Sequence, residues 1–193
     1  ARAFAQKNEK VVIWTSWPKN IEIINGLLQD LNPVYIHGGI KSGDVNDPNS
    51  REYKINKFKN DDSCFVFIAN PASSAESISL HQVCRKCIYV DRTFNAAQYL
   101  QSRDRIHRIG MDIRKEVEVY ILIHEDTIDE RINYRLNEKI ERLEEFLDDD
   151  SISVTPVDVN YHSNEVDSTD GIDDQIELDD LEYLYKTIRD GLK

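Results

Sequence analysis

The sequence of 193 residues contains no apolar run that approaches the roughly 20 residues a membrane-spanning helix needs. Only three cysteines are present, an odd number, and the first residues lack the charged and then apolar layout of a secretion signal. These absences argue against a disulfide framework, which forms in oxidising compartments, and against a membrane segment. We expect a cytoplasmic protein, associated with the nucleoid if its source is bacterial, that makes no membrane contact.

The glycines are few, and their positions exclude a complete nucleotide site. None of the seven opens the pattern G-x-x-x-x-G-K-[ST], whose backbone amides cradle phosphates. The adjacent acids Asp129 and Glu130 start a helical pattern, so they are not the strand-end acidic pair that holds magnesium. We therefore expect no complete ATP site in this chain. Its first residues, ARAFAQKN, are typical of an interior helix, and we expect a further domain before them.

The formal net charge of −12 hides an asymmetry along the chain. Residues 1–124 carry 17 Lys and Arg against 14 Asp and Glu, a balance of +3. Residues 125–193 carry 7 against 22, a balance of −15. The acidic total therefore does not exclude DNA binding by the first part, although the acidic second part would repel DNA.

Short apolar runs alternate with helical patterns before the acidic part. The runs are typical of buried strands in a parallel sheet and lie at 11–16, 33–38, 64–69, 86–91 and 116–123. Helical spacing follows Pro18 up to Leu31 and recurs around 53–58 and over 96–106. This alternation predicts an α/β fold with a doubly wound, mainly parallel sheet and flanking helices. Its functional loops should lie at the carboxyl ends of the strands.

The chain ends in a helical and acidic extension. A long helix is predicted over 127–147, with an apolar stripe that should pack on the domain and comprises Ile128, Ile132, Leu136, Ile140, Leu143 and Leu147. We therefore place the first domain at 1–147 and an acidic flexible linker at 148–174. A terminal amphipathic helix is predicted in 175–193, with Leu181, Leu184, Tyr185, Ile188 and Leu192 on one side. That apolar side needs a cover, from this domain or from another.

The run QSRDRIHRIG has the spacing of a phosphate-binding helix. Steps of four and three residues place Gln101, Arg105 and Arg108 within a helical arc roughly 60° wide, and Gly110 follows. Arginine suits phosphate because its planar fork stays charged and donates two parallel hydrogen bonds. Taken alone, such a pair is more often a solvated helix end with ordinary ion pairs.

The neighbouring motifs favour the phosphate interpretation. QSRDRIHRIG resembles motif VI of superfamily-two helicases, in the form found in Snf-two-type DNA translocases. The resemblance continues in VVIWTSW (motif IV), YIHGG, IANPASSAESISLH (motif V), IYVDRTFNAAQYLQ and TIDERI. These segments follow one another in the order of the family and cover about the first 147 residues. The residues of these segments are more typical of bacterial or phage proteins than of eukaryotic ones.

The resemblance implies a RecA-like lobe, the C-terminal half of an ATP-dependent double-stranded DNA translocase or helicase. Arg105 and Arg108 would be its arginine fingers, and Gln101 and Gly110 would contact the nucleotide. ATP and Mg²⁺ would be held mainly by an N-terminal RecA-like lobe, so this chain alone should be inactive. The residues expected to contact the DNA backbone are Ser16, Ser73, Ser74, Lys41 and Lys54. The lysines could equally belong to an ordinary solvated surface.

Two other functions stay open at this point. Motif V usually has glycines where this chain has Ala75 and Ser77, which favours a degenerate lobe that serves as a protein-interaction module. An RNA helicase of the DEAD-box type would share the fold. Its motif VI normally has glycines beside the arginines, where this chain has Asp104 and His107, so duplex DNA is favoured.

A metal site is not expected. The segment H-x-x-C-x-x-C, formed by His81, Cys84 and Cys87, has zinc-like spacing. Structural zinc sites almost always need four ligands, and Cys64 lies in an apolar run. Cysteine is commonly a small buried hydrophobic residue, which is the interpretation we adopt.

Overall fold

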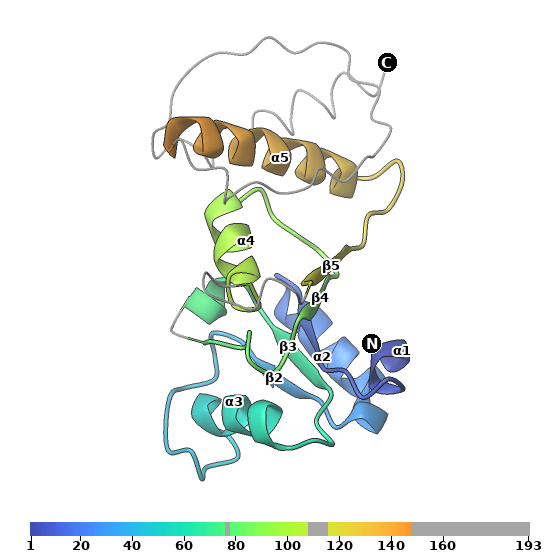
Figure 1. The fold of residues 1–193 in the computed structure, drawn as a ribbon, viewed down its shortest axis with the longest axis vertical. Coiled ribbons are helices and arrows are strands. Elements are labelled where there is room, and N and C mark those ends of the chain that lie inside the picture. The colour runs from blue at the N-terminus through green and yellow to red at the C-terminus, as the bar shows by residue number, and fades with distance from the viewer. Residues whose placement is uncertain (76–77, 108–115, 148–193) are drawn as a thin grey trace.

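A five-stranded parallel sheet forms the centre of the protein (Figure 1). The structure, a computed structural model, describes residues 1–75, 78–107 and 116–147. The strand order is β2-β3-β1-β4-β5, and every pair of neighbours is parallel. The strands are β1 (Val11–Trp14), β2 (Val34–Ile36), β3 (Val66–Ala69), β4 (Lys86–Tyr89) and β5 (Glu118–Ile121). All five lie within predicted runs, so the predicted parallel sheet is confirmed.

The central strands are buried on both faces. β1 lies between β3 and β4, with Val11 opposite Val66 and Val12 opposite Cys87. Every residue of β1 and β3 is buried, as expected of a parallel sheet covered on two sides. Alternate residues of β1 enter two separate apolar clusters, so Val12 and Trp14 face one side of the sheet and Ile13 faces the other.

Helices cover the two faces unequally. On the face of Ile13 lie the helices α1 (Arg2–Ala5) and α2 (Pro18–Leu27). On the face of Trp14 lie α3 (Arg51–Asn60), α4 (Ala96–Arg103) and α5 (Ile128–Leu147). Two short 3₁₀ turns, η1 (Gln29–Leu31) and η2 (Ala72–Ala75), complete the described elements. The long helix α5 crosses above α4 at one end of the molecule (Figure 1).

Local sequence explains where the helices begin. Pro18 stands in the first turn of α2, where its missing N–H is not needed. Ser50 caps α3 by accepting a hydrogen bond from the N–H of Tyr53 at 3.0 Å. Asn95 caps α4 by accepting from the N–H of Gln98 at 3.0 Å.

The helix at the arginines is shorter than predicted. α4 ends at Arg103, and Asp104 to Ile106 form a turn, so Arg105 does not continue a helical face with Gln101. The N–H of Leu80 donates to the carbonyl of Arg105 at 2.9 Å, and Ile106 is fully buried. A long-range hydrogen bond and one buried side chain thus compete with continuation of the helix. The prediction that Gln101 and Arg105 share one helical arc is therefore wrong.

The apolar stripe of α5 packs largely as predicted. Ile132, Leu136 and Ile140 are buried, and Leu143 packs against the same cluster. Ile128 is the exception, because at the start of the helix it is 47% exposed. Leu147 belongs to the helix, but its side chain lies outside the described part. In α2 the stripe is also shorter than predicted, since Leu27 at its end is 65% exposed.

Candidate functional site at the carboxyl edge of the sheet

Three neighbouring strands end in polar residues at one edge of the sheet. Thr15 and Ser16 follow β1, Asn70 follows β3 and Asp91 comes two residues after β4. Because the strands are parallel, their carboxyl ends meet at the same edge. β1 connects towards β2 and β4 connects towards β5, in opposite directions along the sheet. The crevice between β1 and β4 is therefore the topological switch point, where open α/β sheets bind ligands.

The carboxylate of Asp91 accepts hydrogen bonds from the turn that follows β1 and from the start of α2. One carboxylate oxygen accepts a hydrogen bond from the backbone N–H of Ser16 at 2.6 Å. The other accepts from the side-chain amide of Asn20 at 3.1 Å and from the hydroxyl of Thr15. Hydrogen bonds to a carboxylate are stronger than those between neutral groups. The turn at Ser16, a predicted DNA contact, is therefore held in one position by a residue from the neighbouring strand.

Asn70 extends this network to motif V. Its amide donates to the carbonyl of Ser16 at 2.6 Å, and its side-chain oxygen accepts from the N–H of Ala72 at 2.8 Å. The hydroxyl of Ser73 donates to the Asn70 carbonyl at 2.9 Å. The guanidinium of Arg51, at the start of α3, donates to the Ser73 carbonyl. Ser16 and Ser73, which the sequence predicted as DNA contacts, thus belong to one hydrogen-bonded edge.

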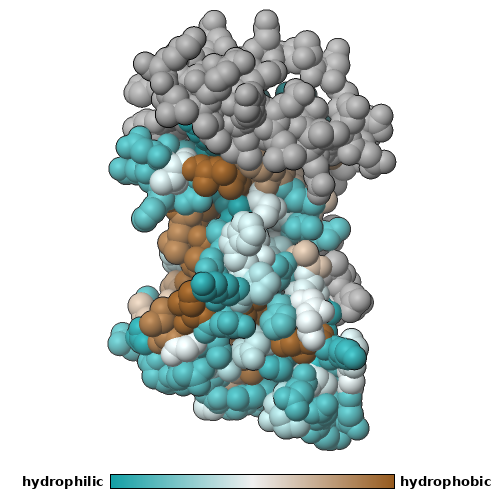
Figure 2. All heavy atoms as spheres, turned by 180° about the vertical axis from the view of Figure 1, so that it is seen from behind, coloured by the Kyte–Doolittle hydropathy of each residue, from teal (hydrophilic) through white to brown (hydrophobic). Residues whose placement is uncertain are grey.

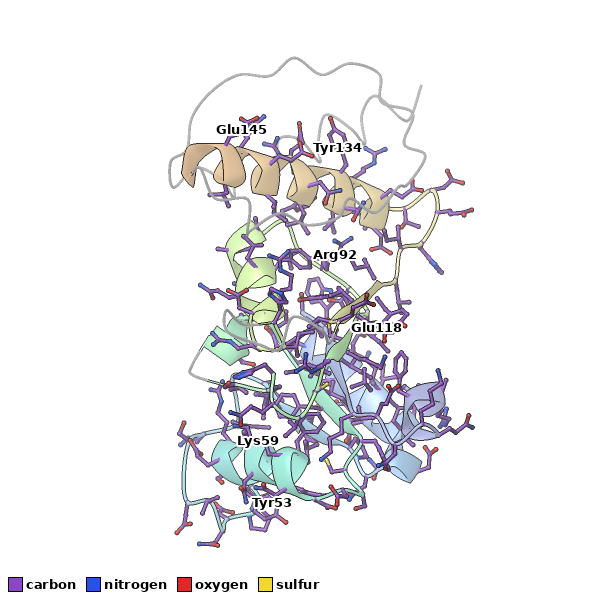
Figure 3. All side chains as sticks on the ribbon, in the orientation of Figure 1. Tyr53, Lys59, Arg92, Glu118, Tyr134 and Glu145 are labelled. Atoms are coloured by element: carbon purple, nitrogen blue, oxygen red, sulfur yellow. The ribbon has the colours of Figure 1, made fainter. Side chains whose placement is uncertain are left out.

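Arg92 links the same edge to the helices above it. Its guanidinium donates to the side-chain oxygen of Asn133 in α5 at 2.7 Å and lies 5.6 Å from the ring centre of Tyr99 in α4. Burial lowers the pKa of Arg92 from its ordinary value, although the tyrosines near it oppose that shift. Figure 3 shows Arg92 between the sheet and α5. A single dipeptide, Asp91 and Arg92, therefore joins the turn after β1 to α4 and α5.

The predicted nucleotide-contact residues are only partly within the described structure. Gln101 is exposed in the last turn of α4, and Arg105 is partly buried in the turn beyond it. The backbone of Arg105 is fixed by its bond to Leu80, in the segment that follows η2. Arg108 and Gly110 lie outside the described residues. The arginine turn and the motif V segment are therefore hydrogen-bonded neighbours.

The predicted DNA-contact lysines lie near α3. The ammonium group of Lys54 lies 4.2 Å from the ring centre of Tyr35, a cation–π distance. Burial, followed by repulsion from Lys57, lowers the pKa of Lys54. Lys41 is exposed in the loop before α3, and its carbonyl accepts from the N–H of Arg51 at 3.1 Å. The side chain of Ser74, in η2, lies outside the described part.

The cysteines behave as core residues. Cys64, Cys84 and Cys87 are buried and form no disulfide. Burial raises the pKa of Cys64 and of Cys84 to about 11, so both thiols are protonated at neutral pH. The Nδ1 atom of His81 lies 2.7 Å from the hydroxyl oxygen of Ser79, at hydrogen-bonding distance. Within 1–75, 78–107 and 116–147, no group of three His, Cys, Asp or Glu could hold a metal ion.

Membrane-spanning helices were predicted to be absent. Within residues 1–75, 78–107 and 116–147, no helix is long and apolar enough to cross a membrane.

Sequence reasoning missed the residues that organise the edge. Asn70, Asp91 and Arg92 received no role, although each stands at the end of a predicted buried strand or just beyond it. That position was the available signal, because polar residues at the carboxyl ends of parallel strands face the functional edge. The contact between Arg51 and Ser73 had no such signal. It joins the start of a helix to a distant loop.

Comparison with known proteins finds a family and several relatives. Residues 2–110 match the family described as "Helicase conserved C-terminal domain". The chain is 30% identical over 148 residues to ATP-dependent helicase FUN30 of Saccharomyces cerevisiae, covering 76% of this chain and 12% of that protein. It is 29% identical over 136 residues to ATP-dependent helicase fft3 of Schizosaccharomyces pombe, covering 70% and 14%. Human lymphoid-specific helicase is 28% identical over 142 residues, covering 72% and 16%.

A solved structure shows the same fold. The crystal structure of the C-terminal part of the Fun30 ATPase domain has a TM-score of 0.58 and 28% sequence identity. The match covers 69% of this chain and 40% of that chain. The predicted RecA-like α/β fold is thereby confirmed.

The chain belongs to the helicase conserved C-terminal domain family, in the form found in Snf-two-type ATP-dependent helicases. It spans well under a fifth of the length of the three relatives above. Those relatives come from fungi and human, so the expectation of a bacterial or phage-like source is not supported.

Proposed function

We propose that this chain is the C-terminal RecA-like lobe of an ATP-dependent translocase that moves along double-stranded DNA. The hydrogen-bonded carboxyl edge carries this proposal. One network joins the turn after β1, the motif V loop and the strand end at Asp91. The arginine turn is hydrogen-bonded to Leu80, in the motif V segment. A lobe of this kind must hold its DNA-facing loops and its nucleotide-facing loops in fixed positions relative to one another. The hydrogen bonds of this edge can hold them so.

Arg105 and Arg108 are proposed to act on ATP bound between two lobes. Both would stabilise the charge that develops on the transferred phosphoryl group, with Gln101 and Gly110 as further contacts. The residues present fit a phosphate in part, because Arg105 carries a guanidinium on a turn whose backbone is hydrogen-bonded to Leu80, and Gln101 is exposed. The described part offers no acidic cluster for Mg²⁺. We therefore assign the metal and the phosphate loop to an N-terminal lobe.

The DNA surface is proposed to follow the same edge towards α3. Ser16, Ser73 and Ser74 would donate hydrogen bonds to phosphate oxygens, and Lys41 and Lys54 would supply charge. Contacts of this kind fix the register of the protein on a duplex and carry no base information. Such a lobe would therefore act on DNA without sequence preference. We expect the protein to be located with the DNA of the cell.

The isolated chain should hydrolyse no ATP. Its nucleotide contacts form one side of a site whose phosphate loop belongs to the other lobe. The measurement is steady-state phosphate release by residues 1–193, with and without duplex DNA. The comparison protein joins this lobe to its nucleotide-binding lobe and should turn over ATP faster when DNA is added. Turnover by the isolated chain would refute the half-site assignment. A two-lobe protein without ATPase activity would instead support a protein-interaction module.

Replacing Lys54 by Ala should weaken binding to duplex DNA to a similar degree for different sequences. If its ammonium group contacts a phosphate, the slope of log affinity against log salt should fall by roughly one unit. The measurement is fluorescence anisotropy with labelled duplexes at several salt concentrations. Lys7→Ala, an exposed lysine near the opposite edge of the sheet, is the matched control and should leave the slope unchanged. Equal slopes for all three proteins would remove Lys54 from the DNA surface.

A further inference from the structure

The loop between β4 and α4 holds two parts of the proposed site. Residues 90–95 form this loop, and they belong to neither element. The carboxylate of Asp91 holds the turn at Ser16, and the side-chain oxygen of Asn95 caps α4 through the N–H of Gln98. α4 in turn leads into the arginine turn. The position of this loop therefore sets where the proposed DNA-facing and nucleotide-facing residues lie.

The helix α5 holds this loop at two points. The side-chain oxygen of Asn133 accepts a hydrogen bond from the guanidinium of Arg92 at 2.7 Å. The ammonium group of Lys139 donates to the backbone carbonyl of Phe94 at 3.0 Å. Both bonds have a charged donor, and such bonds are stronger than those between neutral groups. The loop is thus attached, near its middle, to a helix that lies far along the chain.

The two polar residues lie on opposite borders of the apolar stripe of α5. At about 100° per residue, the stripe residues that pack into the apolar cluster share a helical arc of roughly 80° and are Ile132, Leu136, Ile140 and Leu143. Asn133 lies just beyond one border of that arc, and Lys139 lies just beyond the other. Hydrogen bonds therefore fasten the helix on both sides of its apolar contact.

Apolar packing alone would not select one position for α5. Such packing is non-directional, and other apolar side chains, such as Leu27 and Leu122, are exposed elsewhere. Figure 2, the view from behind, shows apolar side chains gathered in a strip along one side of the molecule. Hydrogen bonds act over a narrow range of distance and angle, and a buried amide that loses its partner is costly. Because Asn133 is only 3% exposed, its bond to Arg92 selects against a shifted helix.

We propose that Asn133 and Lys139 are positioning residues, which fix the loop and, through it, both the turn at Ser16 and the start of α4. They act through Arg92 and the Phe94 carbonyl and touch neither DNA nor nucleotide. The stripe of α5 was predicted only to pack on the domain, whereas these two residues give the helix a part in the site. The effect on turnover rests on the proposed function, and the effect on the loop does not.

Hydrogen exchange in the intact chain, followed by NMR, tests the effect on the loop. The double variant Asn133→Leu with Lys139→Met removes both hydrogen bonds and keeps side chains of similar size. It should speed exchange of the Ser16 and Gln98 amides by about tenfold, because their acceptors on the loop are no longer held in place. The amide of Val11, bonded within the centre of the sheet, should exchange as in the parent chain. Unchanged exchange at Ser16 and Gln98 would overturn the proposal, and so would equal acceleration at all three amides, which indicates a general loss of stability.

Conservative variants separate positioning from packing. Asn133→Asp keeps an acceptor for Arg92, and Lys139→Arg keeps a charged donor for the Phe94 carbonyl, so both should exchange like the parent chain. Glu138→Gln is the matched control, because its carboxylate pairs with Arg135 at 3.0 Å within α5 itself. If the conservative variants accelerate exchange as much as the double variant does, the proposal fails. Should the double variant not fold, Lys139→Met alone is measured and should still speed exchange at the start of α4.

Steady-state kinetics of the protein with both lobes test whether this positioning serves the site. The Asn133→Leu, Lys139→Met variant should lower the DNA-stimulated kcat by about tenfold and change the KM for ATP less than twofold, because small misplacements of reacting groups cost rate more than ground-state binding. Glu138→Gln should turn over like the parent. A parental kcat in the double variant would overturn the role in the site. If the parent itself shows no DNA-stimulated turnover, the proposed function fails, and the exchange experiment still decides whether α5 positions the loop.

Discussion

Replacing Arg105 by Ala in the protein that contains both lobes should lower the rate of ATP hydrolysis by a factor of about 10³ to 10⁵, the range known for arginine fingers. The guanidinium acts on charge that appears only in the transition state, so nucleotide affinity should change by no more than a few fold. The measurement is DNA-stimulated turnover at saturating ATP, together with equilibrium binding of a fluorescent nucleotide. The same outcome is expected for Arg108→Ala.

The control for this prediction is Arg142→Ala. Arg142 is exposed on α5, so its loss removes a cation of the same type without touching the carboxyl edge. Its turnover should equal that of the parent protein. If Arg105→Ala also hydrolyses ATP at the parental rate, Arg105 is not a finger. If it instead loses nucleotide binding, Arg105 holds the ground state, and the transition-state role falls to Arg108 alone.

Replacing Phe58 by Ala should lower the free energy of unfolding of the chain by about 3–5 kcal/mol. Phe58 is fully buried and anchors α3 to the sheet, with its ring 5.2 Å from that of Phe67 in β3. Lys10 adds a cation–π contact at 5.3 Å from the ring centre. A domain of this kind has a total stability of about 5–15 kcal/mol, so the loss would leave it close to unfolding.

Urea unfolding measures this effect, because Trp14 is buried in the same cluster and reports its exposure to water. Leu27→Ala is the matched control, since Leu27 is 65% exposed and its truncation should change the free energy by roughly 0.5 kcal/mol or less. A loss below about 1 kcal/mol for Phe58→Ala would mean that α3 is not held to the sheet by this ring.

The strands could be predicted because their signal is local. Runs such as VVIW and VFIA are apolar, β-branched or aromatic throughout, and in a parallel sheet such runs are buried on both faces. The capped starts of the helices at Ser50 and Asn95 depend on single side chains within a few residues of the helix, so local sequence also specifies them. Fold class followed from the alternation of these two signals.

The end of α4 could not be predicted, because it depends on a distant residue. Helical spacing continues through Arg105, but its carbonyl accepts a hydrogen bond from Leu80, which precedes α4 by a whole strand. The residues next to Arg105 in the sequence do not indicate that Leu80 is its partner. The same reason explains the role of Asp91, whose three donors come from the turn after β1 and from the first turn of α2. Motif resemblance indicated which edge of the sheet carries the proposed site, while long-range hydrogen bonds decide the geometry of that edge.

The terminal segment shows a different limit. Residues 175–193 carry an apolar stripe at helical spacing, which predicts a helix with one apolar side. Periodicity indicates that an apolar side needs a partner and carries no information on which partner. For that reason a cover from this domain and a cover from another lobe were both compatible with the sequence.

The position of β1 in the middle of the sheet has a consequence for synthesis of the chain. Val11 pairs with Val66 and Val12 pairs with Cys87, so the strand made first finds its partners only after long intervening segments have been made. Closing such long loops is slow compared with forming a helix. On the ribosome, VVIW therefore stays unpaired until β3 emerges, and one of its edges stays open until β4 follows. During this interval the unpaired edges of the strand favour aggregation of the nascent protein.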